Sequence, residues 1–343
     1  MKHKGISRLA MVLVVVVVIV GASAAFFLLQ TRTTAPQTAP SPVQAGKLKV
    51  SGYNPTVEAY SLVVMAATER GIWSNNDINP EFVTLPSRTT LAADIKEQVD
   101  SGIKIGLNVA TEALLARANG VPIKVVAGYT GDTPTKIYVK ASGPIKTVQD
   151  LDGKKVGVFI VPGSEQRRIL YISNKLGIKT EPVSSGDLTN QDISLQQGRI
   201  DAFVSSDPAA LQMVDSGKLR VLISVSDVLP KPWVNFVVWA TDDIIQQNPD
   251  IVSKFVKATL EAVKYLKDNP SYATDLYAKT TAAQKGLAEK TISQLDWRVD
   301  GRGSGQDLAA AVANVWQYGK DVDIIPASTV VKPELAVDTK FVQ

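Results

Sequence analysis

Two junctions between a strand and a helix carry polar groups suited to contacting a small ligand. The apolar run Val156–Val161 predicts a strand, and the Pro-Gly-Ser that follows it begins a helix. The run Asp201–Val204 predicts a second strand, which ends in Ser-Ser-Asp-Pro before another helix. Parallel strands deliver such groups to the carboxyl edge of their sheet, where open α/β folds hold small ligands. The residues expected at this edge are Gly163, Ser164, Ser205 and Asp207.

A third junction, Asn-Val-Ala-Thr, joins a predicted strand ending at Asn108 to a helix. Backbone N–H groups at a helix start bind anions, so Asn108, Ala110 and Thr111 could face a ligand. The Thr111 side chain could equally cap its own helix, and Asp207 could cap the helix that follows it. Ser164 repeats this arrangement at a second helix start, and the two starts could clamp a sulfonate, a carboxylate or a similar group if they faced each other.

Each of the other candidate side chains has a structural alternative. Tyr53 and Asn54 could supply an aromatic wall and an amide, although Asn-Pro is also a turn signal. Arg88 lies in a loop that enters a predicted helix and is either a ligand contact or a solvated surface group. Tyr129 could face a ligand or pack at the end of its strand, and Trp233 could stack on a ligand or pack within the fold.

Several other side chains are expected to serve the fold alone. Four tryptophans lie in apolar patterns and are expected in the core, and two adjacent arginines predict a solvated helix face. These residues are Trp73, Trp239, Trp297 and Trp316, and Arg167 with Arg168.

The residue inventory excludes several kinds of chemistry. The chain has no cysteine, and its one histidine, His3, lies in the N-terminal tail. Thiol chemistry is therefore excluded, and imidazole is unavailable to the rest of the chain as a base or metal ligand. Glycine-rich phosphate loops and nucleophile-elbow motifs are missing as well. We expect no metal, no cofactor and no catalytic residue.

The N-terminal tail predicts export. Its four basic residues account for the net charge of +4, so the remainder is formally neutral and does not favour nucleic-acid binding. The uncharged run Leu9–Leu29 is long enough to cross about 30 Å of hydrocarbon. Basic residues before it predict a single-pass anchor over 1–29 with the body outside the cell. Cleavage as a signal peptide after Ala22-Ser23-Ala24 is the alternative, giving a secreted or periplasmic body. Residues 30–46 form a Pro/Thr/Ala-rich linker.

From Lys47, predicted strands, among them Lys136–Lys140, alternate with helices until about Val225. This alternation predicts an α/β fold with mostly parallel sheets flanked by helices. A strand at Phe236–Ala240 is followed by helices over 249–267, 271–279, 282–295 and 304–319. Two α/β lobes with a helical C-terminal return would accommodate this order.

The order and spacing of several segments resemble extracytoplasmic solute-binding proteins of ABC importers. The first lobe carries LKVSGY, ERGIW, NPEFVTL and IKEQVDSGIKIGLNVATEALLARANGVPIKVVAGY, and the second carries IKTVQDLDGKKVGV and GRIDAFVSSDP. The chain is most similar to the NMT1/THI5-like and alkanesulfonate/nitrate/taurine-binding branch, over about residues 47–316. The resemblance implies the two-lobed periplasmic-binding-protein fold of type II, with crossovers near 129–135 and 226–233. Lobe 1 would comprise 47–131 and 229–343, and lobe 2 would comprise 132–228.

The resemblance also implies a function and marks departures from the family. The lipid-carrying cysteine of many bacterial members is missing, so the N-terminal helix would provide membrane attachment. The active-site histidine and cysteine-rich motif of the yeast pyrimidine synthases are missing too, which argues against an enzyme. We expect a monomer that delivers a small organic anion, such as a sulfonate, or a nitrate-, taurine- or thiamine-pyrimidine-precursor-like ligand, to an ABC permease. The alternatives are an external sensing module and an exported enzyme using Asp/Glu or Ser.

Overall fold

The computed structural model describes residues 47–342 except 54–60, 85–91, 207 and 304–306. Its first five-stranded sheet has the order β2-β1-β3-β10-β4. β1 pairs in parallel with β2 and β3, whereas β10 runs antiparallel to both β3 and β4. The strands are β1 (Leu48–Tyr53), β2 (Pro80–Thr84), β3 (Ile105–Val109), β4 (Ile123–Gly128) and β10 (Phe236–Thr241).

The second sheet repeats this plan in the order β7-β6-β8-β5-β9. β6 pairs in parallel with β7 and β8, and β5 runs antiparallel to β8 and β9. Both sheets are therefore mixed, with one antiparallel strand among five, which agrees with the expectation of mostly parallel sheets. The strands are β5 (Lys136–Lys140), β6 (Lys154–Val158), β7 (Thr180–Ser184), β8 (Ala202–Ser205) and β9 (Leu219–Ser224).

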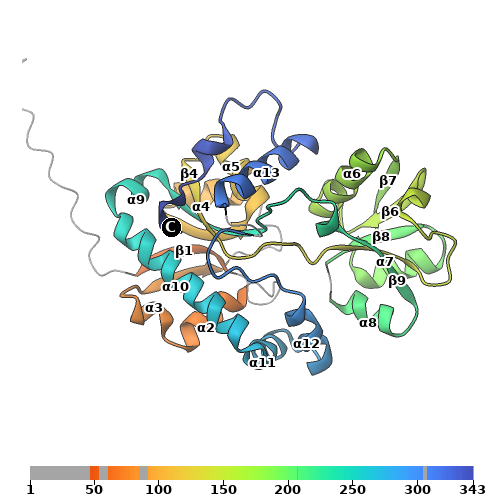
Figure 1. Cartoon of the computed structure of the whole chain (residues 1–343), viewed down its shortest axis with the longest axis horizontal. Helices are drawn as coiled ribbons and strands as arrows, with labels where there is room; N and C mark the ends of the chain where they lie inside the picture. The colour runs from red at the N-terminus through yellow and green to blue at the C-terminus, as the bar shows by residue number, and fades with distance from the viewer. Residues whose placement is uncertain (1–46, 54–60, 85–91, 207, 304–306, 343) are drawn as a thin grey trace, which may run out of the picture. The chain divides into compact units, whose positions relative to one another are not determined.

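Helices cover both sheets (Figure 1). Around the first sheet, α2 and α3 pack on α10, and α4 and α13 pack on α5. The helices of the first sheet are α2 (Leu62–Glu69), α3 (Ile72–Asn75), α4 (Ala92–Asp100), α5 (Ala110–Ala118), α9 (Asp242–Gln247), α10 (Pro249–Asp268), α11 (Pro270–Thr281), α12 (Lys285–Ser293) and α13 (Leu308–Asp321). Those of the second are α6 (Ser164–Leu176), α7 (Leu188–Gln196) and α8 (Ala209–Asp215). Short 3₁₀ turns span Val148–Leu151 (η2), Val225–Asp227 (η3), Pro333–Ala336 (η4) and Thr339–Phe341 (η5).

Residue alternation along the strands divides the core of the second sheet between its two faces. Ile137 and Val139 of β5 belong to a large apolar cluster that includes Ile169 of α6 and continues into the first sheet. Tyr138 points to the opposite face, where it stacks on Phe203 at 5.3 Å within a separate cluster. The four tryptophans expected in the core are all buried in the large cluster, which confirms that prediction: Trp73, Trp239, Trp297 and Trp316.

The N-terminal expectations concern residues outside those described. The predicted anchor Leu9–Leu29 and the linker 30–46 both fall in this part of the chain. Within the described ranges, none of the helices has the length and apolar character needed to traverse a bilayer.

Candidate ligand site at the carboxyl edges of the two sheets

The described candidate residues gather at the carboxyl edges of the two sheets. Tyr53 ends β1, Asn108 stands one residue before the end of β3, and Tyr129 follows β4 directly. In the second sheet Ser205 ends β8, and Gly163 with Ser164 lies at the start of α6. Asn54, Arg88 and Asp207 lie outside the described residues.

At the junction of β3 and α5, Asn108 is buried. Its Oδ1 accepts a 2.7 Å hydrogen bond from the Val109 N–H, while its Nδ2 has no partner among the described residues. The Ala110 N–H donates to the Asn235 carbonyl at 2.8 Å. Thr111 does not cap the helix, because Val109 occupies the cap position and provides no side-chain bond. The N–H groups of Val109 and Ala110, at the helix start expected to bind an anion, therefore already have acceptors within the chain.

Glu112, in the first turn of α5, is the charged group that sequence reasoning missed. It retains 8% exposure, and its Oε1 lies 3.2 Å from Nη1 of Arg167 on α6. Burial raises the pKa of the Glu112 carboxyl, and this effect is opposed by the charge of Arg167 and a hydrogen bond from the backbone of Ala92. The ion pair joins a helix of the first sheet to a helix of the second.

The start of α6 is also occupied by an acidic side chain. Glu165 Oε2 accepts a 2.6 Å hydrogen bond from the Phe159 N–H. Gly163 is required by close packing, since a Cβ there would lie 2.5 Å from the Ile160 carbonyl oxygen. Both helix starts of the expected anion clamp thus have an acidic residue of their own in the first turn.

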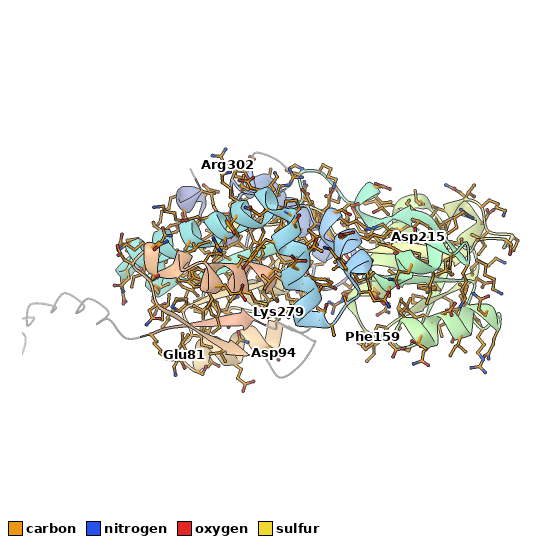
Figure 2. All side chains as sticks on the ribbon, turned by 90° about the horizontal axis from the view of Figure 1, so that it is seen from below. Glu81, Asp94, Phe159, Asp215, Lys279 and Arg302 are labelled. Atoms are coloured by element: carbon orange, nitrogen blue, oxygen red, sulfur yellow. The ribbon has the colours of Figure 1, made fainter. Side chains whose placement is uncertain are left out.

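The expected strand Val156–Val161 ends three residues early, at Val158. Phe159, Ile160 and Val161 form bends and are 46%, 50% and 38% exposed, so this apolar run is not a buried strand. Figure 2 labels Phe159 at the surface of the part built on the second sheet. Phe159, Ile160 and Val161 thus form an exposed apolar segment before α6, which we call the apolar lip.

Arg167 and Arg168 correct a second expectation, because they do not form a solvated face. Both are half-buried. Arg167 pairs with Glu112, and Arg168 Nη1 donates a 2.6 Å hydrogen bond to Oγ1 of the buried Thr135. Thr135 lies in the segment that leads from β4 into β5, so α6 is tied to this connection.

Two connecting segments join the sheets, at 129–135 and 225–235. Asn235 N–H donates to the Thr130 carbonyl at 3.1 Å, and Phe236 N–H donates to Thr130 Oγ1 at 2.9 Å. The segments therefore lie side by side where they meet the first sheet. Both positions agree with the expected crossovers.

Aromatic rings pack around these connections. Trp233 is 4% exposed and meets Tyr318 of α13 edge-on at 5.4 Å, and Tyr171 of α6 lies 4.8 Å from Tyr318. Burial raises the pKa of Tyr318 to about 12. Tyr129 is equally buried, with its ring 6.0 Å from Phe236. Trp233 and Tyr129 thus both occupy packing positions beside the connections.

Within the described ranges, no group of three or more His, Cys, Asp and Glu side chains is arranged to hold a metal ion. Ser205 is buried at the end of β8. The candidate site is therefore made of hydroxyl and amide groups, one exposed apolar lip and the Glu112–Arg167 pair.

The comparison with known families decides the relationship of the chain. A model of the NMT1/THI5-like family matches residues 58–273. The chain belongs to this family. The riboflavin-binding protein RibY of Chloroflexus aurantiacus is 28% identical over 263 residues, covering 72% of this chain and 70% of RibY.

Other relatives differ in the activity that their names state. The 4-amino-5-hydroxymethyl-2-methylpyrimidine phosphate synthase THI12 of Saccharomyces cerevisiae is 24% identical over 234 residues, covering 64% of this chain and 66% of the synthase. A putative sulfonate ABC transporter protein, the periplasmic sulfonate-binding protein SsuA from Methylobacillus flagellatus, has a TM-score of 0.71 at 19% identity, covering 87% of this chain and 92% of SsuA. This likeness shows that the NMT1/THI5-like chain has a periplasmic-binding-protein fold.

Proposed function

We propose that this member of the NMT1/THI5-like family is an extracytoplasmic solute-binding protein that delivers a small molecule to an ABC importer. The observation that carries the proposal is the pair of mixed sheets joined by two adjacent connections. Such a hinge lets two lobes close on a ligand, and contacts made only in the closed form shift the open–closed equilibrium. The importer would then recognise the closed form.

The proposed lobes follow the two sheets. Lobe 1 comprises 47–131 and 229–343, and lobe 2 comprises 132–228, so every strand of each sheet falls within its own lobe. Residues 1–29 would anchor the chain in the membrane, and 30–46 would be the linker. The support for the anchor is the uncharged run Leu9–Leu29 with basic residues before it. The body would work as a monomer on the outer side of the membrane.

The ligand would lie between the two carboxyl edges. We place Asn108 foremost among its contacts, because the buried Nδ2 of this residue lacks a partner among the described residues and could donate to a ligand. Gly163 lies at the start of α6 in the second lobe, and Ser164 beside it offers an exposed hydroxyl. The remaining proposed contacts are Tyr53, Asn54, Arg88, Ala110, Thr111, Tyr129, Ser205, Asp207 and Trp233.

We propose a small organic anion, such as a sulfonate, as the ligand. The sulfonate-binding SsuA supports this class by its shared fold, while the name of RibY makes an uncharged heterocycle the competing class. No catalytic step is proposed for the chain. The names of the yeast synthases make unaltered recovery of the ligand a necessary part of the test.

The test is native mass spectrometry of the full-length chain, freshly purified in mild detergent. We expect one small molecule to be retained at a one-to-one ratio, and to be recovered with its mass unchanged after incubation. Adding that molecule should stabilise the fold by about 2.7 kcal/mol at a hundred times its dissociation constant. A chain that retains nothing and is stabilised by no sulfonate, carboxylate or pyrimidine would refute the proposal.

A further inference from the structure

Two adjacent arginines of α6 have more hydrogen-bonding capacity than the chain uses. Arg167 makes one hydrogen bond to the described residues, to Glu112, and Arg168 makes one, to Thr135. A guanidinium carries about five N–H donors in a planar fork. Both side chains are half-buried, so water has limited access to the remaining donors.

The charges in this cluster do not balance. Among the described residues, Glu112 is the carboxylate within salt-bridge distance of Arg167, and none lies that close to Arg168. Thr135 offers Arg168 a neutral hydroxyl. Taken alone, Glu112, Arg167 and Arg168 carry one net positive charge, and the Asp94 carboxylate of α4 acts on Glu112 as well. A positive charge in a partly buried position is costly unless a counter-ion is supplied.

Glu112 itself is a poor partner for Arg167. The contact uses a single Nη1–Oε1 approach of 3.2 Å, whereas carboxylates and similar anions bind a guanidinium best through two parallel hydrogen bonds. Burial also disfavours the ionised form of Glu112, whose pKa stays raised in spite of Arg167. A bidentate anion would therefore compete well with Glu112 for this guanidinium.

We propose that Glu112 is a resident counter-ion on Arg167 and that an acidic group of the ligand replaces it there, while Arg168 supplies a second guanidinium. The inference rests on the proposed function, since it places the charged end of the ligand where α5 meets α6. It assigns charge selectivity to the two arginines, because each helix start of the expected clamp already has an acidic residue in its first turn.

Titration calorimetry on the full-length chain in detergent micelles tests this assignment with matched probes. The probes are pentanesulfonate with pentanesulfonamide, and pentanoate with pentanamide, which differ in charge at similar shape. We expect the chain to bind at least one anion ten times more tightly than its amide. Arg167→Gln should lower this ratio about tenfold, as the loss of a charged hydrogen bond implies. Glu112→Gln should raise anion affinity several-fold, because the competitor is removed.

Controls and a conservative variant keep the result interpretable. Arg199→Gln and Glu181→Gln change the same charges at exposed positions of the second lobe and should leave the ratio unchanged. Arg167→Lys keeps the charge without the planar fork, so it should retain part of the ratio if Arg167→Gln fails to fold.

Three outcomes would overturn the assignment. They are weaker anion binding by Glu112→Gln, an unchanged ratio in folded Arg167→Gln, and a wild-type chain that binds no anion of the panel. In the third case, a different molecule retained in native mass spectrometry would leave the solute-binding proposal standing. If no molecule is retained and no probe binds, both proposals fail.

Discussion

The Glu112–Arg167 pair predicts an asymmetry in stability that can be measured without knowing the ligand. Arg167→Gln leaves a buried carboxylate without its cation, whereas Glu112→Gln removes the carboxylate whose ionised form burial already disfavours. The two substitutions break the same contact. They should nevertheless have very different effects on the free energy of unfolding.

The exposure of the two side chains determines how much each substitution should change the free energy of unfolding. Removing one partner of a fully buried pair costs about 3–5 kcal/mol, and an exposed pair contributes about 0–1 kcal/mol. Arg167 keeps 24% and Glu112 keeps 11% of side-chain exposure, so the pair lies between these limits. We expect Arg167→Gln to lower the free energy of unfolding by about 2 kcal/mol, and Glu112→Gln to change it by less than about 1 kcal/mol.

The loss of unfolding free energy caused by Arg167→Gln, called its deficit, should also depend on pH. Loss of the cation raises the pKa of Glu112 in the folded state further above the ordinary value of 4.5. Between that ordinary value and the raised folded pKa, the folded state binds a proton that the unfolded state has released, so stability rises as the pH falls. The difference between wild type and Arg167→Gln should therefore shrink from pH 7 toward about pH 4.5 and stay constant below it.

Urea unfolding of the full-length proteins in detergent, followed by tryptophan fluorescence at pH 7, 6, 5 and 4.5, measures these effects. The exposed-site variants Arg199→Gln and Glu181→Gln control for the change of net charge. Equal losses from Arg167→Gln and Glu112→Gln would refute the reasoning. A deficit that grows as the pH falls would refute it as well, since protonated Glu112 needs no cation.

Other positions give simpler tests. Gly106→Ala should lower the free energy of unfolding, measured in urea, by about 2–3 kcal/mol, because its Cβ would lie 2.3 Å from Cζ2 of Trp239. Gly286→Ala should raise the free energy of unfolding by about 0.5 kcal/mol, because Gly286 lies in α12 with open space around it. Lys290→Gln should cost less than about 1 kcal/mol, because the carboxylate that Lys290 contacts on α8 is 63% exposed. Tyr318 should stay protonated at pH 11, since burial raises its pKa to about 12, so wild type and Tyr318→Phe should show equal tyrosinate absorbance there. A smaller loss from Gly106→Ala than from Lys290→Gln, or a clear absorbance difference at pH 11, would contradict these expectations.

Local patterns predicted elements well where burial followed them. β5 has the expected bounds Lys136–Lys140, because its alternating side chains reach two different buried clusters. β6 was expected to continue to Val161 because Phe159, Ile160 and Val161 are apolar. These three residues are exposed, so hydrophobicity alone could not mark where the strand stops.

Strand direction was the part of the fold that alternation could not provide. A strand–helix–strand order predicts parallel pairing, and this holds for β1 with β2 and for β6 with β7. β5 and β10, by contrast, each follow a connection from the other sheet rather than a helix of their own sheet. Both strands therefore run antiparallel to their neighbours, and no local sequence feature indicates this direction.

The acidic residues in the first turns of α5 and α6 can be read directly from the sequence. Sequence reasoning treated the starts of α5 and α6 as donors for an anion, yet Glu112 directly follows Thr111, and Glu165 directly follows Ser164. An acidic residue in the first turn interacts favourably with the helix dipole, and so reduces what that helix start can offer a ligand of the same sign. Arg167 could not be placed from the sequence, because its partner lies 55 residues away. The proposed selectivity for an anion therefore depends on Arg167 of α6 meeting Glu112 of α5, which is a property of the packed pair and not of either junction alone.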